Sequence, residues 1–232
     1  MSESAYRDRD QRILDTVAEL VLRWGAKRVT IDEVARRAGI GKGTVYLHFE
    51  SRTRLLAAVL MRESIAITDE LIAAMEQDPS AVLPSEQARL TYLATRARPL
   101  SWAMMSRDRE LLGELAHEAA VQPLWTWSRE VGRACLQVLR DHELLRADLD
   151  HATHELIFNA TQAGFYLHPA GIEAEPAATA AALRTAIAGA LEPADPPDAG
   201  RLATAAAAAI AHYRPLRDRL AEEIDRRPTR TK

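Results

Sequence analysis

The chain has 232 residues, of which 47% are hydrophobic and 27% charged, a globular composition that excludes wholesale disorder. A single cysteine, Cys135, excludes an intramolecular disulfide, and no apolar run is long enough to span a bilayer. The net charge of -3 divides unevenly, because residues 1–60 carry 11 basic and 8 acidic side chains and the remainder is acidic. This asymmetry favours a polyanionic partner for the amino-terminal part, and with no apolar leader in the first ten residues we expect a cytoplasmic protein.

Helical periodicity runs through the whole chain, so the expected fold class is all-α. Glycine and proline mark the ends of most segments. The expected helices are, in chain order, one ended by Gly25, then 30–39, 41–49, 51–77, 85–105, 107–121, 124–142, 152–167, 176–191 and 201–224. We expect the proline-rich residues 193–200 to form a linker before the last helix, and a basic tail to follow that helix.

Signals for two short helices lie close together after residue 29. Thr30 and Glu33 have the spacing of a capping box, in which the hydroxyl and the carboxylate satisfy amides at a helix start. Gly39 supplies the left-handed backbone that a tight turn needs, and a second short helix begins near Gly41. Two short helices joined in this way predict a helix-turn-helix, whose second helix can enter the major groove of DNA.

Three cations crowd the amino ends of two successive predicted helices. Lys42 begins the third helix, and Arg52 and Arg54 begin the fourth. A positive charge is unfavourable at that end of the helix dipole. We therefore interpret the three cations as ligands for DNA phosphates that dock against both helix starts.

The segment Thr30 to Arg52 (TIDEVARRAGIGKGTVYLHFESR), followed by Leu55-Leu56, resembles the tetracycline-repressor (TetR) family. The resemblance is strong over roughly residues 10–60 and architectural beyond them. It implies a three-helix helix-turn-helix DNA-binding domain over 1–52 and a carboxyl-terminal helical domain over 53–192 that binds a ligand and dimerises. The linker, terminal helix and basic tail then occupy 193–232.

The resemblance implies a homodimeric transcriptional repressor that a small, mostly hydrophobic effector releases from a near-palindromic DNA operator. An activator of the same fold stays open, since the sequence does not say where the operator lies. The implied DNA-binding residues are Thr30, Gly41, Lys42, Gly43, Thr44, Tyr46, Leu47, His48 and Arg52.

Individual roles follow from side-chain chemistry. Lys42 can donate to guanine or to a phosphate, and Thr44 can contact a phosphate or a thymine methyl group. Tyr46 and His48 resemble phosphate clamps, while Thr30 and Arg52 would hold flanking phosphates that carry no sequence information. Arg7 and Arg9 are expected in a flexible arm that follows the DNA backbone, and Val45 and Phe49 in the domain core.

The middle and late helices carry clustered aromatic and methionine side chains. A sensor pocket needs apolar walls and a few polar anchors. The candidate effector-binding residues are Tyr92, Trp102, Met105, Trp125, Phe158, Gln162 and Tyr166. The resemblance places the dimer interface in a four-helix arrangement formed by residues 152–167 and 176–191 of each protomer, with alanines that allow close packing. No cofactor or metal is expected.

Two other function classes compete with this interpretation. A helical metal enzyme is suggested by His151, His154 and Glu155, and by Glu114 with His117, but neither set completes a known ligand pattern. We therefore expect the protein not to be an enzyme. A helical adaptor that binds protein is disfavoured by the cations at the helix starts.

Overall fold

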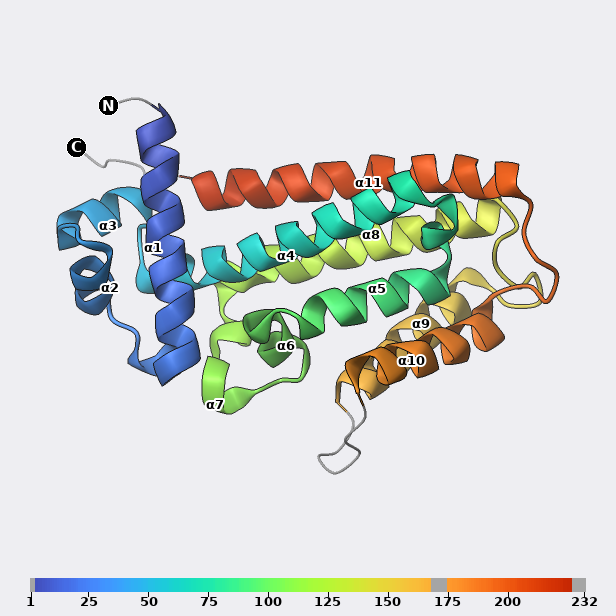
Figure 1. Cartoon of the computed structure of the whole chain (residues 1–232), viewed down its shortest axis with the longest axis horizontal. Coiled ribbons are helices and arrows are strands. Elements are labelled where there is room, and N and C mark those ends of the chain that lie inside the picture. The colour runs from blue at the N-terminus through green and yellow to red at the C-terminus, as the bar shows by residue number, and fades with distance from the viewer. Residues whose placement is uncertain (1–2, 168–174, 227–232) are drawn as a thin grey trace. The chain divides into compact units, whose positions relative to one another are not determined.

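The computed structural model describes residues 3–167 and 175–226, with side chains from residue 9 onward. Within these ranges the chain forms helices and no strand (Figure 1), which confirms the all-α prediction. The α-helices are α1 (Glu3–Trp24), α2 (Ile31–Ala38), α3 (Lys42–His48), α4 (Arg52–Gln77), α5 (Pro84–Arg96), α6 (Pro99–Met105), α7 (Arg109–Leu112), α8 (Gln122–Asp141), α9 (His151–Tyr166), α10 (Pro176–Leu191) and α11 (Ala199–Asp225). The short 3₁₀ helices are η1 (Ala26–Arg28), η2 (Pro79–Val82), η3 (Leu115–His117) and η4 (Ala119–Val121).

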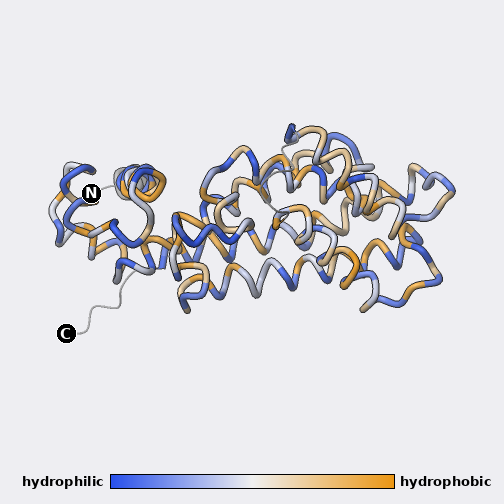
Figure 2. The backbone as a smooth tube through the Cα atoms, turned by 90° about the horizontal axis from the view of Figure 1, so that it is seen from below, coloured by the Kyte–Doolittle hydropathy of each residue, from blue (hydrophilic) through white to orange (hydrophobic). Residues whose placement is uncertain are grey.

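Most of these helices are amphipathic. Figure 2 shows apolar and polar residues recurring in turn along the helical parts of the backbone. This recurrence is the pattern by which a helix buries one stripe and leaves the other in water. It explains why the sequence periodicity located the long helices well.

Backbone contacts divide the chain into two compact units, each assembled from segments that are distant in sequence. Of the described residues, the first unit contains 3–65, 99–125 and 219–226, and the second contains the others. Helices α4, α8 and α11 contribute residues to both units.

In the first unit, α1 packs against α2, and α2 packs against α3. Aliphatic side chains of these helices and of the first turn of α4 are almost completely buried, namely Ile13, Leu14, Val17, Leu20, Val34, Val45 and Leu55. The segment from α6 to α7 packs on the same unit, where Gly113 lies directly beneath the Lys27 side chain. Gly113 has φ 59°, a conformation that glycine adopts without strain.

In the second unit, α10 packs along α5 and α9. Leu183, Ile187 and Leu191 recur on one face of α10 and are completely buried. The carbonyl of Leu191 accepts a hydrogen bond from the amide of Arg146 at 2.8 Å, which ties the end of α10 to the loop before α9.

A polar network also lies inside the second unit. The Tyr213 hydroxyl donates to Gln87 Oε1 at 2.9 Å, and Gln87 Nε2 donates to the carbonyl of Ala81 at 3.0 Å. Cys135 contacts Tyr213, and burial raises the pKa of the Cys135 thiol to about 12. The network satisfies polar groups that would otherwise be buried without partners.

Two helix predictions are wrong. The helix expected over 85–105 divides into α5 and α6 because Pro99 has no amide hydrogen and disfavours helical backbone at the residue before it. The helix expected over 107–121 is replaced by α7, η3 and η4. Arg107 has φ 57° and Gly113 has φ 59°, so neither residue can continue a right-handed helix.

Candidate nucleic-acid interface

The turn between α2 and α3 is formed by the residues that were predicted to form it. Thr30 Oγ1 accepts a hydrogen bond from the amide of Glu33 at 3.3 Å and caps α2. Gly39 ends α2 with φ 66° in the left-handed region. Gly41 precedes α3 in extended backbone and offers no side chain to cap its amides. The amino end of α3 therefore presents backbone donors that a phosphate can accept.

Helix α3 has a buried face and an exposed face. Val45 is completely buried, whereas Tyr46 is 43% exposed and Leu47 is 53% exposed. Gly43 is also exposed, and its spacing from Tyr46 and Leu47 (i, i+3, i+4) places all three on one side of the helix. An exposed aromatic ring and leucine do not contribute to the domain core, so this face is suited to contact a partner.

Lys42 and Thr44 flank this face. Lys42 Nζ lies 3.0 Å from Asp32 on α2, and the hydrogen bond with Asp32 raises the pKa of Lys42. Both side chains are more than half exposed, so water screens the pair and a phosphate can compete with Asp32. Thr44 is half-buried beside Gly41, with its hydroxyl close to that glycine.

The argument that folding alone does not explain the three cations is wrong, whereas their binding to phosphates stays a prediction. Arg52 Nε donates to the carbonyl of Val29 at 2.6 Å, and Arg52 Nη2 donates to the carbonyl of Ala26. Arg54 Nη1 donates to Glu223 Oε1 at 2.7 Å. Together with the Lys42 pair, these contacts give each cation an internal partner, so their presence alone does not demand a phosphate.

The prediction that His48 clamps a phosphate is also wrong for this structure. The side chain is 1% exposed, and its Nδ1 contacts Asp10 Oδ1 on α1. A buried imidazole cannot reach a DNA backbone outside the domain, so His48 connects α3 to α1. The arm expected at Arg7 and Arg9 is likewise replaced by helix, since α1 includes both positions. The Arg7 side chain lies outside the described residues, and Arg9 is half-buried.

The Glu33 carboxylate that follows the Thr30 cap forms a small ionic cluster. Arg36 donates to it at 2.5 and 2.8 Å, and Arg37 donates at 2.8 Å. The hydrogen bonds from Arg36 and then Arg37 lower the pKa of Glu33 to about 2. Arg37 also lies over the ring of Trp24 with its guanidinium carbon 5.0 Å from the ring centroid, which links α2 to α1.

The seven candidate effector residues are distributed over both units. Trp102, Met105 and Trp125 belong to the first unit and are half-buried, and Trp125 Nε1 donates to the carbonyl of Ala116 at 3.1 Å. In the second unit, the rings of Tyr92 and Tyr166 are buried with centroids 5.5 Å apart.

Phe158 and Gln162 lie one turn apart on α9 and are half-buried. The effector pocket therefore stays a prediction.

Three residues of the competing metal patterns have partners within the protein. His154 Nε2 lies 3.0 Å from the carbonyl of Arg146, and burial lowers the pKa of His154. Glu155 pairs with Arg133 at 3.1 Å, and Glu114 pairs with Arg109 at 2.7 Å. Among the residues that the structure describes, no group of three or more histidine, cysteine, aspartate or glutamate side chains is arranged to hold a metal. None of the helices in the described ranges has the length and apolarity needed to cross a bilayer.

Comparison with known proteins relates part of this chain to a protein family. Residues 13–59 match the family model described as bacterial regulatory proteins, tetR family. This amino-terminal segment is therefore similar to the tetR family. The matched segment contains the Thr30 cap, the Gly39 turn, all of α3 and the first turns of α4.

Curated relatives match part of the chain. The transcriptional regulator SrpR of Pseudomonas putida is 42% identical over 50 residues, which cover 22% of this chain and 24% of SrpR. The transcriptional repressor KstR of Rhodococcus jostii RHA1 is 33% identical over 90 residues, covering 39% of this chain and 40% of KstR. The chain thus matches less than half the length of these two relatives.

One solved structure extends the likeness beyond the matched segment. The Streptomyces coelicolor protein SCO4942 superposes with a TM-score of 0.51 at 24% identity and covers 77% of this chain and 96% of its own. At that identity the likeness concerns the fold. It supports an amino-terminal helix-turn-helix followed by a helical domain.

Three acidic residues of this region were missed by sequence reasoning. Asp10 and Glu223 lie 38 and 169 residues from their partners, and no periodic signal connects them. Asp32 lies 10 residues from Lys42, and the tight turn that predicts a helix-turn-helix also brings two short helices together. The Asp32–Lys42 pair is the one that could have been found.

Proposed function

We propose that this protein is a transcriptional regulator that binds duplex DNA through the exposed face of α3. The observation that carries the proposal is the exposure of Tyr46 and Leu47 on the second helix of a TetR-family helix-turn-helix. In that frame the second helix enters the major groove and its exposed side chains contact base edges. Thr30, Gly41, Lys42, Gly43 and Thr44 flank the same surface as proposed contacts to phosphates or bases.

A repressor acting as a homodimer on a near-palindromic operator is the specific form that we propose. A single helix-turn-helix reads a short half-site, and a two-fold dimer reads two. KstR, a relative of the amino-terminal region, is named a repressor. An activator differs only in where the operator lies.

Release by a small hydrophobic effector completes the proposal. Filling a pocket beside Tyr92, Phe158, Gln162 and Tyr166, or beside the tryptophans of the first unit, would shift α4 and change the spacing of the two recognition helices. The effector must then bind the state with low DNA affinity more tightly. Compounds that bind the protein without altering operator affinity would contradict this part.

Two experiments test DNA binding and dimeric symmetry together. The first is selection of bound duplexes from a random pool, and the second is a salt titration on the selected operator. We expect an inverted repeat, and an affinity whose logarithm falls with the logarithm of salt concentration by about 0.9 for each phosphate contacted. Selection of no consensus together with salt-independent binding would reject the proposal.

Leu47→Ala provides the test of the α3 face, with Leu22→Ala as its matched control. Both leucines are exposed, Leu47 at 53% on α3 and Leu22 at 43% on α1. Loss of a base contact weakens operator binding by about tenfold to a hundredfold. We expect that loss for Leu47→Ala and unchanged binding for Leu22→Ala, measured by fluorescence anisotropy.

A further inference from the structure

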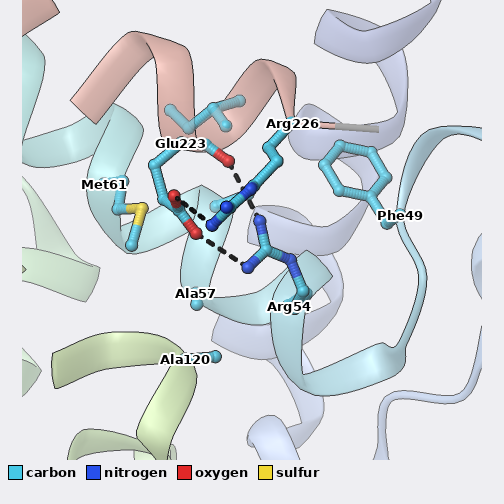
Figure 3. A pocket seen from close by; sticks show the side chains of 9 residues that line it. Phe49, Arg54, Ala57, Met61, Ala120, Glu223 and Arg226 are labelled. Carbon is cyan, nitrogen blue, oxygen red and sulfur yellow. Dashed lines mark hydrogen bonds and ion pairs between the residues drawn. The ribbon is translucent and has the colours of Figure 1, made fainter. Parts of the chain in front are cut away.

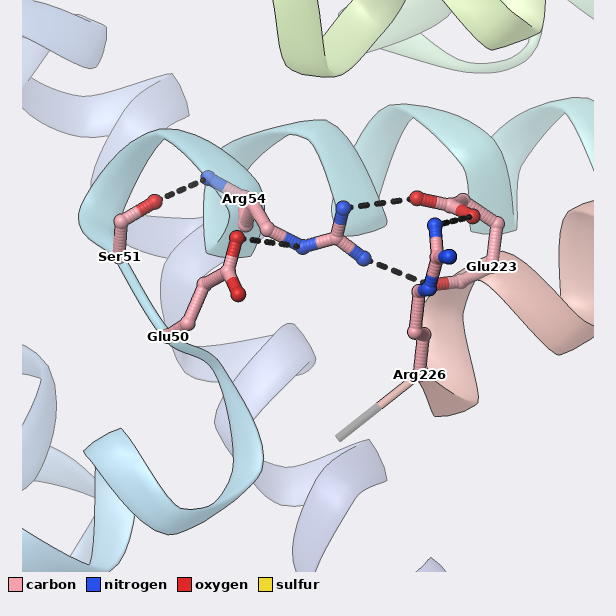
Figure 4. Close-up of polar contacts among 5 residues, drawn as sticks. All are labelled: Glu50, Ser51, Arg54, Glu223 and Arg226. Atoms are coloured by element: carbon pink, nitrogen blue, oxygen red, sulfur yellow. Dashed lines mark hydrogen bonds and ion pairs between the residues drawn. The ribbon is translucent and has the colours of Figure 1, made fainter. Parts of the chain in front are cut away.

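The last turn of α11 contacts the first turn of α4 within the first unit. Arg54 Nη1 donates to the carboxylate of Glu223 at 2.7 Å, and Arg54 Nη2 donates to the backbone carbonyl of the same residue at 3.1 Å. Figure 4 shows this two-point contact, in which one guanidinium holds both the side chain and the main chain of Glu223. Glu50 and Arg226 add weaker ion pairs at 3.6 and 3.5 Å.

Apolar groups surround this contact. Phe49, Ala57, Met61 and Ile224 line the same small hollow as Arg54 and Glu223 (Figure 3). The Glu223 side chain is 13% exposed and that of Arg54 is 22% exposed. Charge-assisted hydrogen bonds with two donors and little water hold their geometry more closely than exposed ion pairs do.

The first turn of α4, which Glu223 contacts through Arg54, directly follows the proposed recognition helix α3 in the chain. Phe49 ends α3 through a hydrogen bond from its amide to the carbonyl of Val45 at 2.9 Å. Only residues 49–51 separate α3 from α4, and the Ser51 hydroxyl accepts a hydrogen bond from the Arg54 amide at 3.2 Å. Fixing the first turn of α4 therefore limits the orientations that the carboxyl end of α3 can adopt.

We infer that Glu223 is a positioning residue for DNA reading, which acts through Arg54 to hold α3 in its reading orientation. The inference rests on the proposed DNA-binding function and assigns a part of it to a residue far along the chain. If the contact is removed, α3 samples several orientations and only a fraction reads the operator. Apparent operator affinity falls by that fraction. Contacts to phosphates tolerate small rotations and carry no sequence information, so binding to random DNA should change little.

Glu223→Ala and Glu222→Ala form a matched pair of variants. Both remove one negative charge from the same turn of α11, but Glu222 is exposed and lies outside the Arg54 contact. We expect Glu223→Ala to lower operator affinity about tenfold, as for losing one charged hydrogen-bonded pair. Its random-DNA affinity and salt dependence should match those of Glu222→Ala, which should read the operator as the natural chain does.

Two further measurements separate positioning from general instability. The exchanged pair Arg54→Glu with Glu223→Arg should recover at least part of the ratio of operator affinity to random-DNA affinity. Amide hydrogen exchange at residues 45–51, measured without DNA, should rise in Glu223→Ala and stay unchanged in Glu222→Ala. This second readout does not depend on the proposed function.

The inference is overturned if Glu223→Ala and Glu222→Ala show the same affinity ratio and the same exchange at residues 45–51. It is also overturned if Glu223→Ala weakens operator and random-DNA binding equally while lowering the melting temperature, because that result describes a structural role. Salt-independent binding by the natural chain rejects the proposed function itself, and with it this assignment.

Discussion

Arg52 illustrates how a single charge can be misread from its position in a helix. A cation at a helix start opposes the dipole, yet Arg52 donates to the carbonyls of Val29 and Ala26 and closes the loop between η1 and α2. Its guanidinium therefore has a folding role whether or not it also contacts DNA. His48 is a second example, because its side chain is buried against Asp10 and is not accessible to a phosphate.

Replacing Arg52 by methionine keeps much of the aliphatic volume and removes both hydrogen bonds. Because the carbonyls of two buried residues, Ala26 and Val29, then lose their donor, we expect the free energy of unfolding to fall by about 1–3 kcal/mol. Urea denaturation followed by circular dichroism measures the change. A stability equal to that of the natural chain would show that water replaces the guanidinium without loss.

The pKa of Glu33 gives a pH dependence with a definite sign. Arg36 and Arg37 lower that pKa from 4.5 to about 2, so the folded state holds the carboxylate ionised where the unfolded state begins to protonate. The stabilisation is present above pH 4.5 and is lost as the pH falls toward 2. The stability difference between the natural chain and Glu33→Gln should shrink over that window, as acid titration of the melting temperature would show. A difference that is constant from pH 6 to pH 3 contradicts this account.

The residues that could be predicted from sequence have partners within one turn. The Thr30 hydroxyl accepts from an amide three residues away, and Gly39 ends α2 through its own left-handed backbone. The partners of Arg52, His48 and Arg54 lie 23 to 169 residues away. These pairs arise only from tertiary packing, which periodicity and capping rules do not describe.

At the scale of the element, α2 and α3 are well specified because capping, turn and hydrophobic signals agree. The region from α6 to η4 is poorly specified, since its helices are short and positive φ angles at Arg107 and Gly113 interrupt it. Only one of those two residues is a glycine. Apart from Gly113, little in the sequence therefore indicates that a helix over 107–121 does not form.

Gly39 and Gly43 should respond to alanine in opposite ways. Gly39 has φ 66°, so Gly39→Ala strains the turn and should lower the unfolding free energy by about 1 kcal/mol. Gly43 is in α3 with open space around it, so Gly43→Ala should raise the unfolding free energy by about 0.5 kcal/mol. Thermal denaturation measures both changes.

DNA binding gives the second readout for Gly43. If α3 approaches the groove at this position, the added methyl group should weaken operator binding although the domain is more stable. Tight binding by a stabilised Gly43→Ala variant would place the DNA contact elsewhere on the helix-turn-helix.

At the scale of the whole molecule, α9 and α10 carry exposed apolar side chains. Leu156 is 68% exposed, and alanines 177, 178, 181 and 182 of α10 are exposed as well. Small side chains allow helices to approach closely, which suits the proposed four-helix dimer interface. That interface stays a prediction.

Leu156→Arg tests the interface directly. A charge buried between two protomers is strongly unfavourable, so the variant should sediment as a monomer at concentrations where the natural chain is a dimer. Leu22→Arg introduces the same charge at an exposed leucine of α1 and should remain dimeric. A dimeric Leu156→Arg variant would move the interface away from this part of α9.

Cys135 has a practical consequence for such measurements. Thiol reagents attack the thiolate, and a buried group with a pKa of about 12 is almost entirely protonated at neutral pH. The natural chain should therefore give little background with maleimides. If the proposed dimer forms, a spin label attached through Leu47→Cys would then report a single distance between its two α3 helices, and adding a candidate effector would test whether that distance changes.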